Sequence, residues 1–143
     1  MSWIRIWIHL VFATKNREPV LIKPIRTKII SHIIENAEKK NILISSLNGF
    51  SEHLHCLLLL NREDSISKVS QLIKGESSHW INEQKLLKSK FFWQDDYWAV
   101  SVSESHVEAV KKYIDNQEKH HEAKEFNEEI DEFMKKYEWQ YIK

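Results

Sequence analysis

Residues 51–60 read SEHLHCLLLL, and this stretch decides the fold. A polar entry followed by a run of leucines, with no helical spacing of polar positions, is typical of a central strand covered on both faces at its far end. Alternate side chains of a strand point to opposite faces, so one face holds His53, His55, Leu57 and Leu59 and the other holds Leu54, Cys56, Leu58 and Leu60. Two imidazoles therefore stand side by side at the mouth of a core strand, where they can hold a metal ion or a phosphate.

Length and composition predict a globular chain with one domain over residues 1–143. The chain has 143 residues, of which 42% are hydrophobic and 29% charged, enough to bury a proper core. Its apolar runs are too short to cross a bilayer, and the first residues lack the pattern of a cleaved leader. We therefore expect a cytoplasmic protein that has no membrane partner. The single cysteine, Cys56, excludes an internal disulfide and a multi-cysteine zinc site, and we expect it in the core.

The charge is distributed unevenly although the formal net charge is zero. From Glu118 onward the chain has eight acidic and five basic residues, which leaves 16 basic and 13 acidic residues before that point. A mildly basic body with an acidic C-terminal helix is compatible with a DNA-binding face. The six tryptophans either fill the core and an interface or stack on unpaired bases.

The first half of the chain predicts a long strand, a helix and a hairpin of two strands. Apolar and mixed positions alternate from Trp3 to Thr14, as in a long strand. A helix follows Pro24 and runs to about Lys40, because apolar residues recur there at a spacing of four. A short strand over residues 42–47 then leads into the Asn48-Gly49 turn, which hands the chain to the histidine strand.

The second half predicts a helix, a strand region and two further helices. Asp64 or Ser65 caps the next helix, in which Gly75 serves close packing or a local break. The aromatic stretch 91–103 is a strand or a pair of strands with a turn at residues 94–96. A helix over about 104–121 and an acidic helix over about 123–136 complete the chain.

This order of elements predicts an α+β fold. The β-α-β-β-α-β succession over about residues 3–103 is that of a ferredoxin-like antiparallel sheet with two helices on one face. If these helices cover the Leu54 side of the histidine strand, the imidazoles lie on the open face. The helix over 104–121 is then the element available to pack across them.

That helix offers two groups to the imidazoles. Tyr113 and Gln117 are spaced i, i+4 and share a helix face. A phenol, with a pKa near 10, is a weak nucleophile unless a cation lies near its target, and a metal held by His53 and His55 would supply that cation. Gln117 could add a carbonyl ligand, and the product would be a covalent phosphotyrosine.

Plainer interpretations exist for each residue taken alone. A His-x-His pair can be two polar residues at a strand end, and a helical tyrosine is commonly part of amphipathic packing. His120 and His121 could favour the negative end of their helix or assist the site. Only the combination of these residues in one topology indicates a site.

The chain also resembles the single-tyrosine HUH transposases, an insertion-sequence family related to the REP-associated tyrosine transposases. The resemblance covers nearly the whole chain and rests on HLVFATKNREPVL at 9–21, NGFSEHLHCLLLL at 48–60, SISKVSQLIKGESSHWIN at 65–82, FFWQDDYWAVSVSES at 91–105 and VKKYIDNQEKHH at 110–121. It implies that His53 and His55 are the HUH pair, that Tyr113 is the nucleophile and that Gln117 is the third metal ligand.

The resemblance further implies a reaction and its partners. The family cleaves and rejoins single-stranded DNA beside imperfect hairpins through a 5′-phosphotyrosine, with Mg²⁺ or Mn²⁺, and many relatives are homodimers. Where many relatives have a glycine-containing turn before the last core strand, this chain has Asp95-Asp96-Tyr97-Trp98, which could change how that strand begins or contacts DNA. Charge and position alone suggest five phosphate contacts: Arg5, Lys15, Arg17, Lys74 and Lys111.

Two alternatives to a transposase stay open on the sequence. A domesticated hairpin-binding protein of the same fold would bind the same DNA without depending on Tyr113. A metal-dependent nuclease would use Tyr113 only to orient water, and would leave no protein–DNA adduct.

Overall fold

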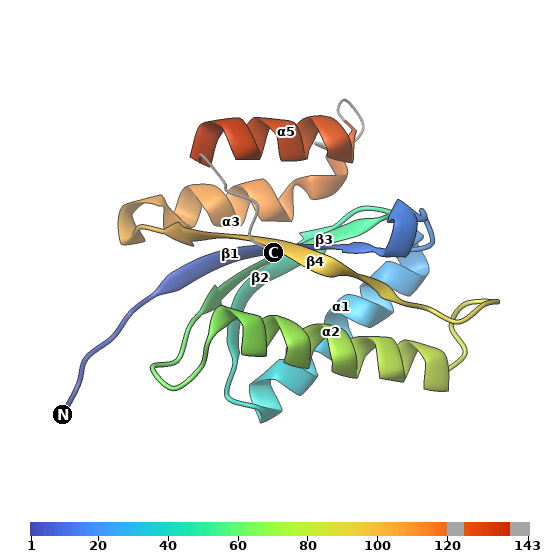
Figure 1. Ribbon diagram of the computed structural model, residues 1–143, viewed down its shortest axis with the longest axis horizontal. Coiled ribbons are helices and arrows are strands. Elements are labelled where there is room, and N and C mark those ends of the chain that lie inside the picture. The colour runs from blue at the N-terminus through green and yellow to red at the C-terminus, as the bar shows by residue number, and fades with distance from the viewer. Residues whose placement is uncertain (120–124, 138–143) are drawn as a thin grey trace.

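The computed structural model describes residues 1–119 and 125–137 (Figure 1). The strands are β1 (Trp7–Thr14), β2 (Leu43–Gly49), β3 (His53–Leu59) and β4 (Trp93–Val102). The helices are α1 (Lys23–Lys39), α2 (Ile66–Glu83), α3 (Val107–Asp115) and α5 (Phe126–Tyr137), with 3₁₀ turns at η1 (Lys15–Arg17) and η2 (Glu104–His106). Among the described residues, no helix combines the length and apolar character that a membrane crossing needs.

The four strands form one antiparallel sheet in the order β2-β3-β1-β4. The predicted α+β, ferredoxin-like arrangement is confirmed, because α1 and α2 join strands that have one strand between them. Figure 1 shows α1 and α2 on one face of the sheet and α3 and α5 on the other. Both faces are therefore covered.

The alternation along β1 divides the apolar side chains between the two layers. Ile8, Leu10 and Phe12 belong to the main core, which is packed against α1 and α2. Trp7 and Val11 point the other way, into two smaller clusters under α3 and α5. The predicted strand begins four residues later than expected, at Trp7, although the Ile6 carbonyl still accepts the Leu60 amide at 2.8 Å.

The prediction of a turn at Asn48-Gly49 is wrong. Both residues belong to β2, where they pair with His55 and Leu54, and the chain reverses over residues 50–52. Gly49 has no positive φ; it is needed because a Cβ there would lie 2.1 Å from the His53 carbonyl oxygen. The glycine thus marks a close approach of two backbones, and this keeps β2 against the start of β3.

Two local predictions in the second half of the chain also need correction. Residues 93–102 form one strand, so no turn is made at 94–96; these residues bulge out where the pairing shifts between Tyr97 and Trp93. Gly75 neither packs closely nor breaks α2, because a Cβ there would meet open space in a continuous helix. The Ser65 cap is confirmed, since its side chain accepts the Lys68 amide.

The predicted helix over about 104–121 is interrupted. It opens with η2, continues as α3 to Asp115, turns at Asn116 and resumes at residues 117–119. The acidic helix α5 spans Phe126–Tyr137, close to the expected 123–136. His120 and His121 lie outside the described residues.

Candidate active site

The first two site residues come from β3, and the strand period places them as the sequence predicts. His53 and His55 face α3 and α5, whereas Leu54, Cys56 and Leu58 belong to the core on the opposite face. Both imidazoles are fully buried. Burial raises the pKa of the Cys56 thiol, as expected for a core cysteine with no part in the site.

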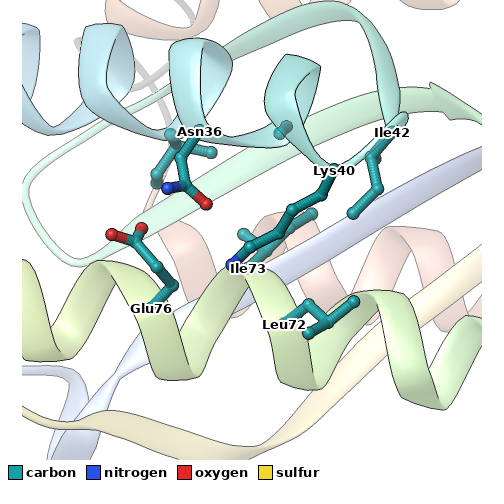
Figure 2. Close-up of a pocket in the computed structure, with 8 residues that line it drawn as sticks. Asn36, Lys40, Ile42, Leu72, Ile73 and Glu76 are labelled. Carbon is teal, nitrogen blue, oxygen red and sulfur yellow. The ribbon is translucent and has the colours of Figure 1, made fainter.

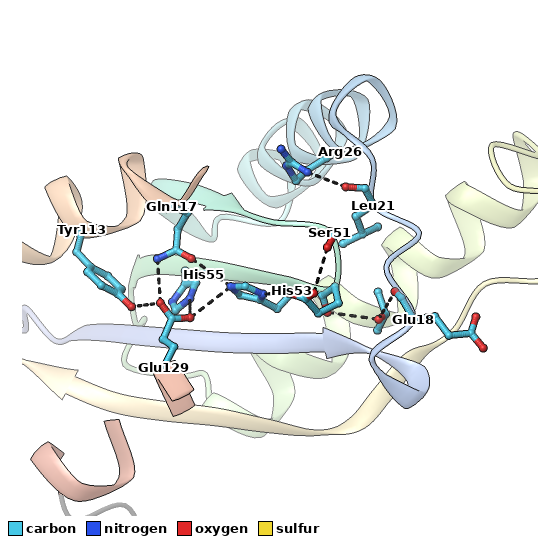
Figure 3. Close-up of polar contacts among 11 residues, drawn as sticks. Glu18, Leu21, Arg26, Ser51, His53, His55, Tyr113, Gln117 and Glu129 are labelled. Atoms are coloured by element: carbon cyan, nitrogen blue, oxygen red, sulfur yellow. Dashed lines mark hydrogen bonds and ion pairs between the residues drawn. The ribbon is translucent and has the colours of Figure 1, made fainter. Parts of the chain in front are cut away.

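The segment around α3 brings Tyr113 and Gln117 to the imidazoles (Figure 3). The Gln117 Oε1 atom lies 3.1 Å from His53 Nε2. The Tyr113 ring stands nearly perpendicular to the His55 ring, with 5.6 Å between the ring centroids. The four residues predicted from the sequence therefore meet within one chain, although the turn at Asn116 separates the tyrosine from the glutamine.

Two contacts hold the end of α3 against β2. The Ser46 hydroxyl donates to Asp115 Oδ1 at 2.6 Å, and Asn48 Nδ2 donates to the Asp115 carbonyl at 3.2 Å. A third link comes from α1, because the buried Arg26 donates to Glu118 Oε1 at 2.8 Å. The hydrogen bond from Arg26 lowers the pKa of Glu118. These links fix the backbone on both sides of Gln117.

Glu129 of α5 is a site residue that the sequence analysis missed. Its carboxylate accepts a hydrogen bond from the Tyr113 hydroxyl and one from Gln117 Nε2 at 3.3 Å. It also lies 2.9 Å from His55 Nε2 and 3.4 Å from His53 Nε2. Only 1% of its surface is exposed. Glu129 is thus the centre of the polar cluster in Figure 3.

The donor set fits a divalent metal ion. His53, His55 and Glu129 each offer one ligand atom, and these three atoms lie within 4.8 Å of one another. The Gln117 carbonyl oxygen borders the same space. Imidazole nitrogen with carboxylate and amide oxygen suits ions such as Mn²⁺ and Zn²⁺.

Further side chains orient each imidazole. His53 Nδ1 lies 2.7 Å from Glu52 Oε1, so its proton points at that carboxylate and Nε2 faces the cluster. His55 Nδ1 lies 2.8 Å from Nε2 of His9, which stands on β1. When His55 Nε2 serves as a ligand, Nδ1 carries the proton and donates it to His9.

The environment gives these histidines different charge preferences. Burial lowers the pKa of His9 to about 3, and the neighbouring His55 adds to the effect, so His9 stays neutral and can accept a proton from its neighbour. Burial would also lower the pKa of His53, but the hydrogen bonds and charges of Glu129 and Glu52 outweigh it and raise that pKa. The His53 environment thus favours a positive charge, which a bound cation can replace.

The five basic residues proposed as phosphate contacts are distributed over the molecule. Arg5 pairs with Glu104, and the Lys15 ammonium lies over the Phe92 ring. Lys74 donates to the carbonyls of Asp95 and Asp96, and burial lowers its pKa. Arg17 lies over the rings of Trp98 and Phe126. Lys111 is on α3, two residues before Tyr113. Their contacts to DNA stay predictions.

Two pockets lie on opposite faces of the sheet, and one of them adjoins the site. The one in Figure 2 lies between α1 and α2, on the face of the sheet opposite the imidazoles, and has a mostly aliphatic lining. A cavity of about 520 Å³ adjoins the site between β4, α3 and α5. Its lining includes Tyr113 and His9 but not His53, His55 or Gln117. The tyrosine is thus reached from this cavity, whereas the ligand atoms are not.

Comparison with known proteins yields matches over most of the chain. The family model described as "Transposase IS200 like" matches residues 2–117. The ISDra2 transposase TnpA of Deinococcus radiodurans is 24% identical over 114 residues, which are 76% of this chain and 81% of that protein.

Solved structures with the same fold belong to similar proteins. A structure described as a transposase from Deinococcus radiodurans R1 has a TM-score of 0.66 at 23% identity, and the match covers 81% of this chain and 93% of that one. The structure of a REP-associated tyrosine transposase bound to a REP hairpin has a TM-score of 0.63 at 20% identity, with 85% and 72% covered.

Proposed function

The chain belongs to the IS200-like transposases, and we propose that it cleaves and rejoins single-stranded DNA through a covalent bond between Tyr113 and a 5′ phosphate. One observation carries this proposal. The tyrosine hydroxyl, two imidazole Nε2 atoms and a glutamine carboxamide meet in one buried polar cluster. This is the set that a phosphoryl transfer needs: a nucleophile beside a place for a cation.

The residues divide the work of the reaction. His53, His55 and Gln117 would hold a divalent ion, Mg²⁺ or Mn²⁺, which supplies polarisation of the phosphate and neutralises charge in the transition state. The Tyr113 oxygen forms a bond to phosphorus while the bond from phosphorus to the 3′ oxygen breaks. The phenol gives up its proton, and the departing 3′ oxygen takes one up. Because the freed 3′ hydroxyl can attack the phosphotyrosine, rejoining needs no ATP.

Surrounding residues keep the nucleophile and the ligands in place. Glu52 and His9 orient the two imidazoles, and the Arg26–Glu118 pair anchors the backbone next to Gln117. A ligand displaced by about 1 Å loses much of the benefit of positioning, so these contacts matter for the proposed reaction.

We propose that the DNA partner is a single strand with an imperfect hairpin. The REP-associated transposase that shares this fold was solved with a REP hairpin, which supports the same class of partner. A DNA partner in turn suggests action in the cytoplasm. Tyr113 and its metal ligands come from one chain, which supports cleavage within a single protomer. The homodimer implied by the family resemblance stays a prediction.

A denaturing gel tests the covalent mechanism. Labelled single strands from both flanks of the gene are incubated with Mn²⁺ and protein. We expect a labelled protein adduct with the wild type, and none with Tyr113→Phe, with His53→Ala or in excess chelator. Tyr97→Phe is the matched control, because it removes one phenol hydroxyl from β4, outside the polar cluster, and should leave the adduct unchanged.

The same gel separates the two alternatives. Cleavage that leaves no adduct and survives Tyr113→Phe would indicate a metal-dependent nuclease. DNA that is shifted in a native gel but stays uncut under every metal would favour a hairpin-binding protein without transposition.

A further inference from the structure

The helix α5 closes the candidate site. His53, His55 and Gln117 have no exposed surface, and Glu129 of α5 is 1% exposed. The Phe126 ring, at the start of α5, stacks flat on the His53 ring, with 4.0 Å between centroids and 9° between planes. No phosphate of a DNA strand can reach the ligand atoms while α5 stays there. The reaction proposed above therefore needs a second arrangement of this helix.

The Glu129 carboxylate fills the space between the proposed nucleophile and the proposed metal ligands, which the reaction needs for a phosphate and its ion. It contacts the nucleophile Tyr113 on one side and Nε2 of His55 on the other, with Gln117 donating to it as well. Figure 3 shows the carboxylate between the tyrosine and the histidines. A carboxylate and a phosphate diester are both anions that accept hydrogen bonds through two oxygens. Glu129 thus accepts hydrogen bonds from Tyr113 and Gln117 as a phosphate could, and its contact with His55 Nε2 fills the place in which that atom would hold an ion.

Phe126 takes a position suited to a nucleobase. Besides the flat stack on His53, its ring meets the Trp98 ring edge-on at 5.8 Å. The Arg17 guanidinium lies 5.2 Å from the Phe126 centroid and 6.0 Å from that of Trp98. Aromatic rings and arginine are the groups on which unpaired bases stack. One strip of the sheet face therefore holds a planar ring next to an anion, as a nucleotide would require.

The remaining features of α5 are those of a helix that can be displaced from the sheet. Glu128, Asp131 and Glu132 of α5 are exposed, so this part of the helix presents negative charge. Among its described side chains, Phe126 and Ile130 are the buried apolar ones, packed on Val11, Ala13 and Trp98. This cluster is separate from the main core, so displacing α5 leaves that core packed.

We propose that α5 is an internal, displaceable mimic of the single-stranded substrate. In the closed arrangement Glu129 stands in for the scissile phosphate and Phe126 for an adjoining base. Single-stranded DNA binds by displacing α5, and it places a phosphate between Tyr113 and the ligands and a base on the strip formed by His53, Trp98 and Arg17. This inference rests on the proposed function and adds to it the binding place of one nucleotide and its built-in competitor.

The equilibrium between the closed and open arrangements of α5 determines the apparent affinity of the protein for DNA. If only a fraction of molecules is open, the observed dissociation constant rises by the inverse of that fraction. Glu129→Gln removes the buried charge from the closed arrangement and should shift the population toward the open one. Glu128→Gln makes the same change of net charge on the exposed side of α5, so it is the matched control.

The first experiment measures DNA binding without chemistry. Fluorescence anisotropy with labelled oligothymidylate of about 20 nucleotides is recorded in excess chelator, so that no cleavage occurs. We expect Glu129→Gln to bind about tenfold more tightly than Glu128→Gln, as for a closed population of about 90%. Phe126→Ala, which keeps Glu129, should shift affinity in the same direction. Equal or weaker binding by Glu129→Gln would overturn the inference.

A second measurement distinguishes a mimic from a permanent metal ligand. Adduct formation is timed at saturating Mn²⁺, with Mn²⁺ binding followed separately by calorimetry. A faster adduct with Glu129→Gln than with Glu128→Gln supports the mimic, even where the metal is bound more weakly. A slower adduct would show that Glu129 serves the reaction itself and would overturn the proposal.

The two proposals fail independently. If no variant forms an adduct but Glu129→Gln still binds oligothymidylate more tightly than its control, the mimic stands and the transesterase does not. If the wild type forms the adduct and the two glutamine variants bind DNA alike, the transesterase stands and the mimic is wrong.

Discussion

The two imidazoles of the site are oriented by different kinds of partner. One partner is the preceding residue in the sequence, and the other lies on the neighbouring strand. His53 relies on Glu52, the preceding residue, whereas His55 relies on His9, which is brought to it by the pairing of β1 with β3. A sequence motif contains the first kind of partner but not the second. The HUH pair can therefore be recognised from the sequence, while the residue that sets the tautomer of His55 depends on strand register.

The acidic residue Glu104 allows a test of side-chain contacts at the other end of β1. It accepts hydrogen bonds from Arg5 Nε at 2.9 Å and from Trp7 Nε1 at 2.6 Å. The bond from Arg5 is the largest influence that lowers the Glu104 pKa below 4.5, and the bond from Trp7 acts in the same direction. A carboxyl group with a lowered folded-state pKa stabilises the fold above its unfolded pKa, and this contribution is lost as the pH falls through the folded value.

We expect the indole N–H resonance of Trp7 to report this titration. In NMR spectra recorded during acidification, its midpoint should lie below 4.5, and Arg5→Ala should move the midpoint upward. Trp7→Phe assigns the signal among the six tryptophans. A wild-type midpoint at or above 4.5 would show that the two hydrogen bonds do not persist in solution.

Glu129 shows why one site residue escaped the sequence analysis. It is one of eight acidic residues after residue 117, and composition does not distinguish it from the others. Its position in the sequence does indicate burial, because the apolar residue Phe126 lies three positions before it and the apolar residue Ile130 lies one position after it. Burying an acidic side chain on the apolar face of a helix costs free energy of folding unless the carboxylate has partners. This pattern therefore indicates a buried carboxylate with polar partners. Its partners, from β3 and α3, could be known only from the fold.

Among the elements, the turn between β2 and β3 shows the limits of dipeptide signals. Asn-Gly is a strong hairpin signal because both residues tolerate positive φ. Here the glycine is required for a different reason, the approach of the His53 carbonyl, and the chain reverses over residues 50–52. The hairpin was thus predictable from the sequence, but its position was not. The aromatic stretch 91–103 likewise predicted a strand without revealing its bulge.

The helix α2 contains a glycine with no structural requirement that we find. Gly75 is exposed in the helix interior, and a Cβ there meets no other atom within 4 Å. Gly75→Ala should therefore stabilise the protein by about 0.5–1 kcal/mol, because alanine loses less backbone entropy on folding. Urea denaturation should show a higher midpoint with an unchanged slope.

Gly49→Ala is the matched comparison for that change. The same added methyl would lie 2.1 Å from a backbone oxygen in β3, so this variant should unfold at a lower urea concentration than the wild type. Two variants with shifts of the same sign would contradict the different roles assigned to these two glycines.

For the whole molecule, the sheet with α1 and α2 was predictable because periodicity marks each element and few topologies satisfy that order. The arrangement of the helices over the opposite face, which holds the candidate site, was less predictable. The sequence indicated one helix over the imidazoles, whereas the structure places both α3 and α5 there. The acidic composition of α5 does not indicate where the helix packs, and its role as a cover follows from the burial of Phe126, Glu129 and Ile130.

The covalent attachment of DNA to Tyr113 is the claim on which the whole account depends, and mass spectrometry of the adduct tests it most directly. Trypsin cleaves after Lys112 and Lys119, so residues 113–119 form a peptide with one tyrosine. After nuclease trimming, we predict a nucleotide joined through its 5′ phosphate to this peptide, and release of the 5′-labelled fragment with a free 3′ hydroxyl. A nucleotide on any other peptide, or retention of the 5′-labelled fragment by the protein, would contradict it.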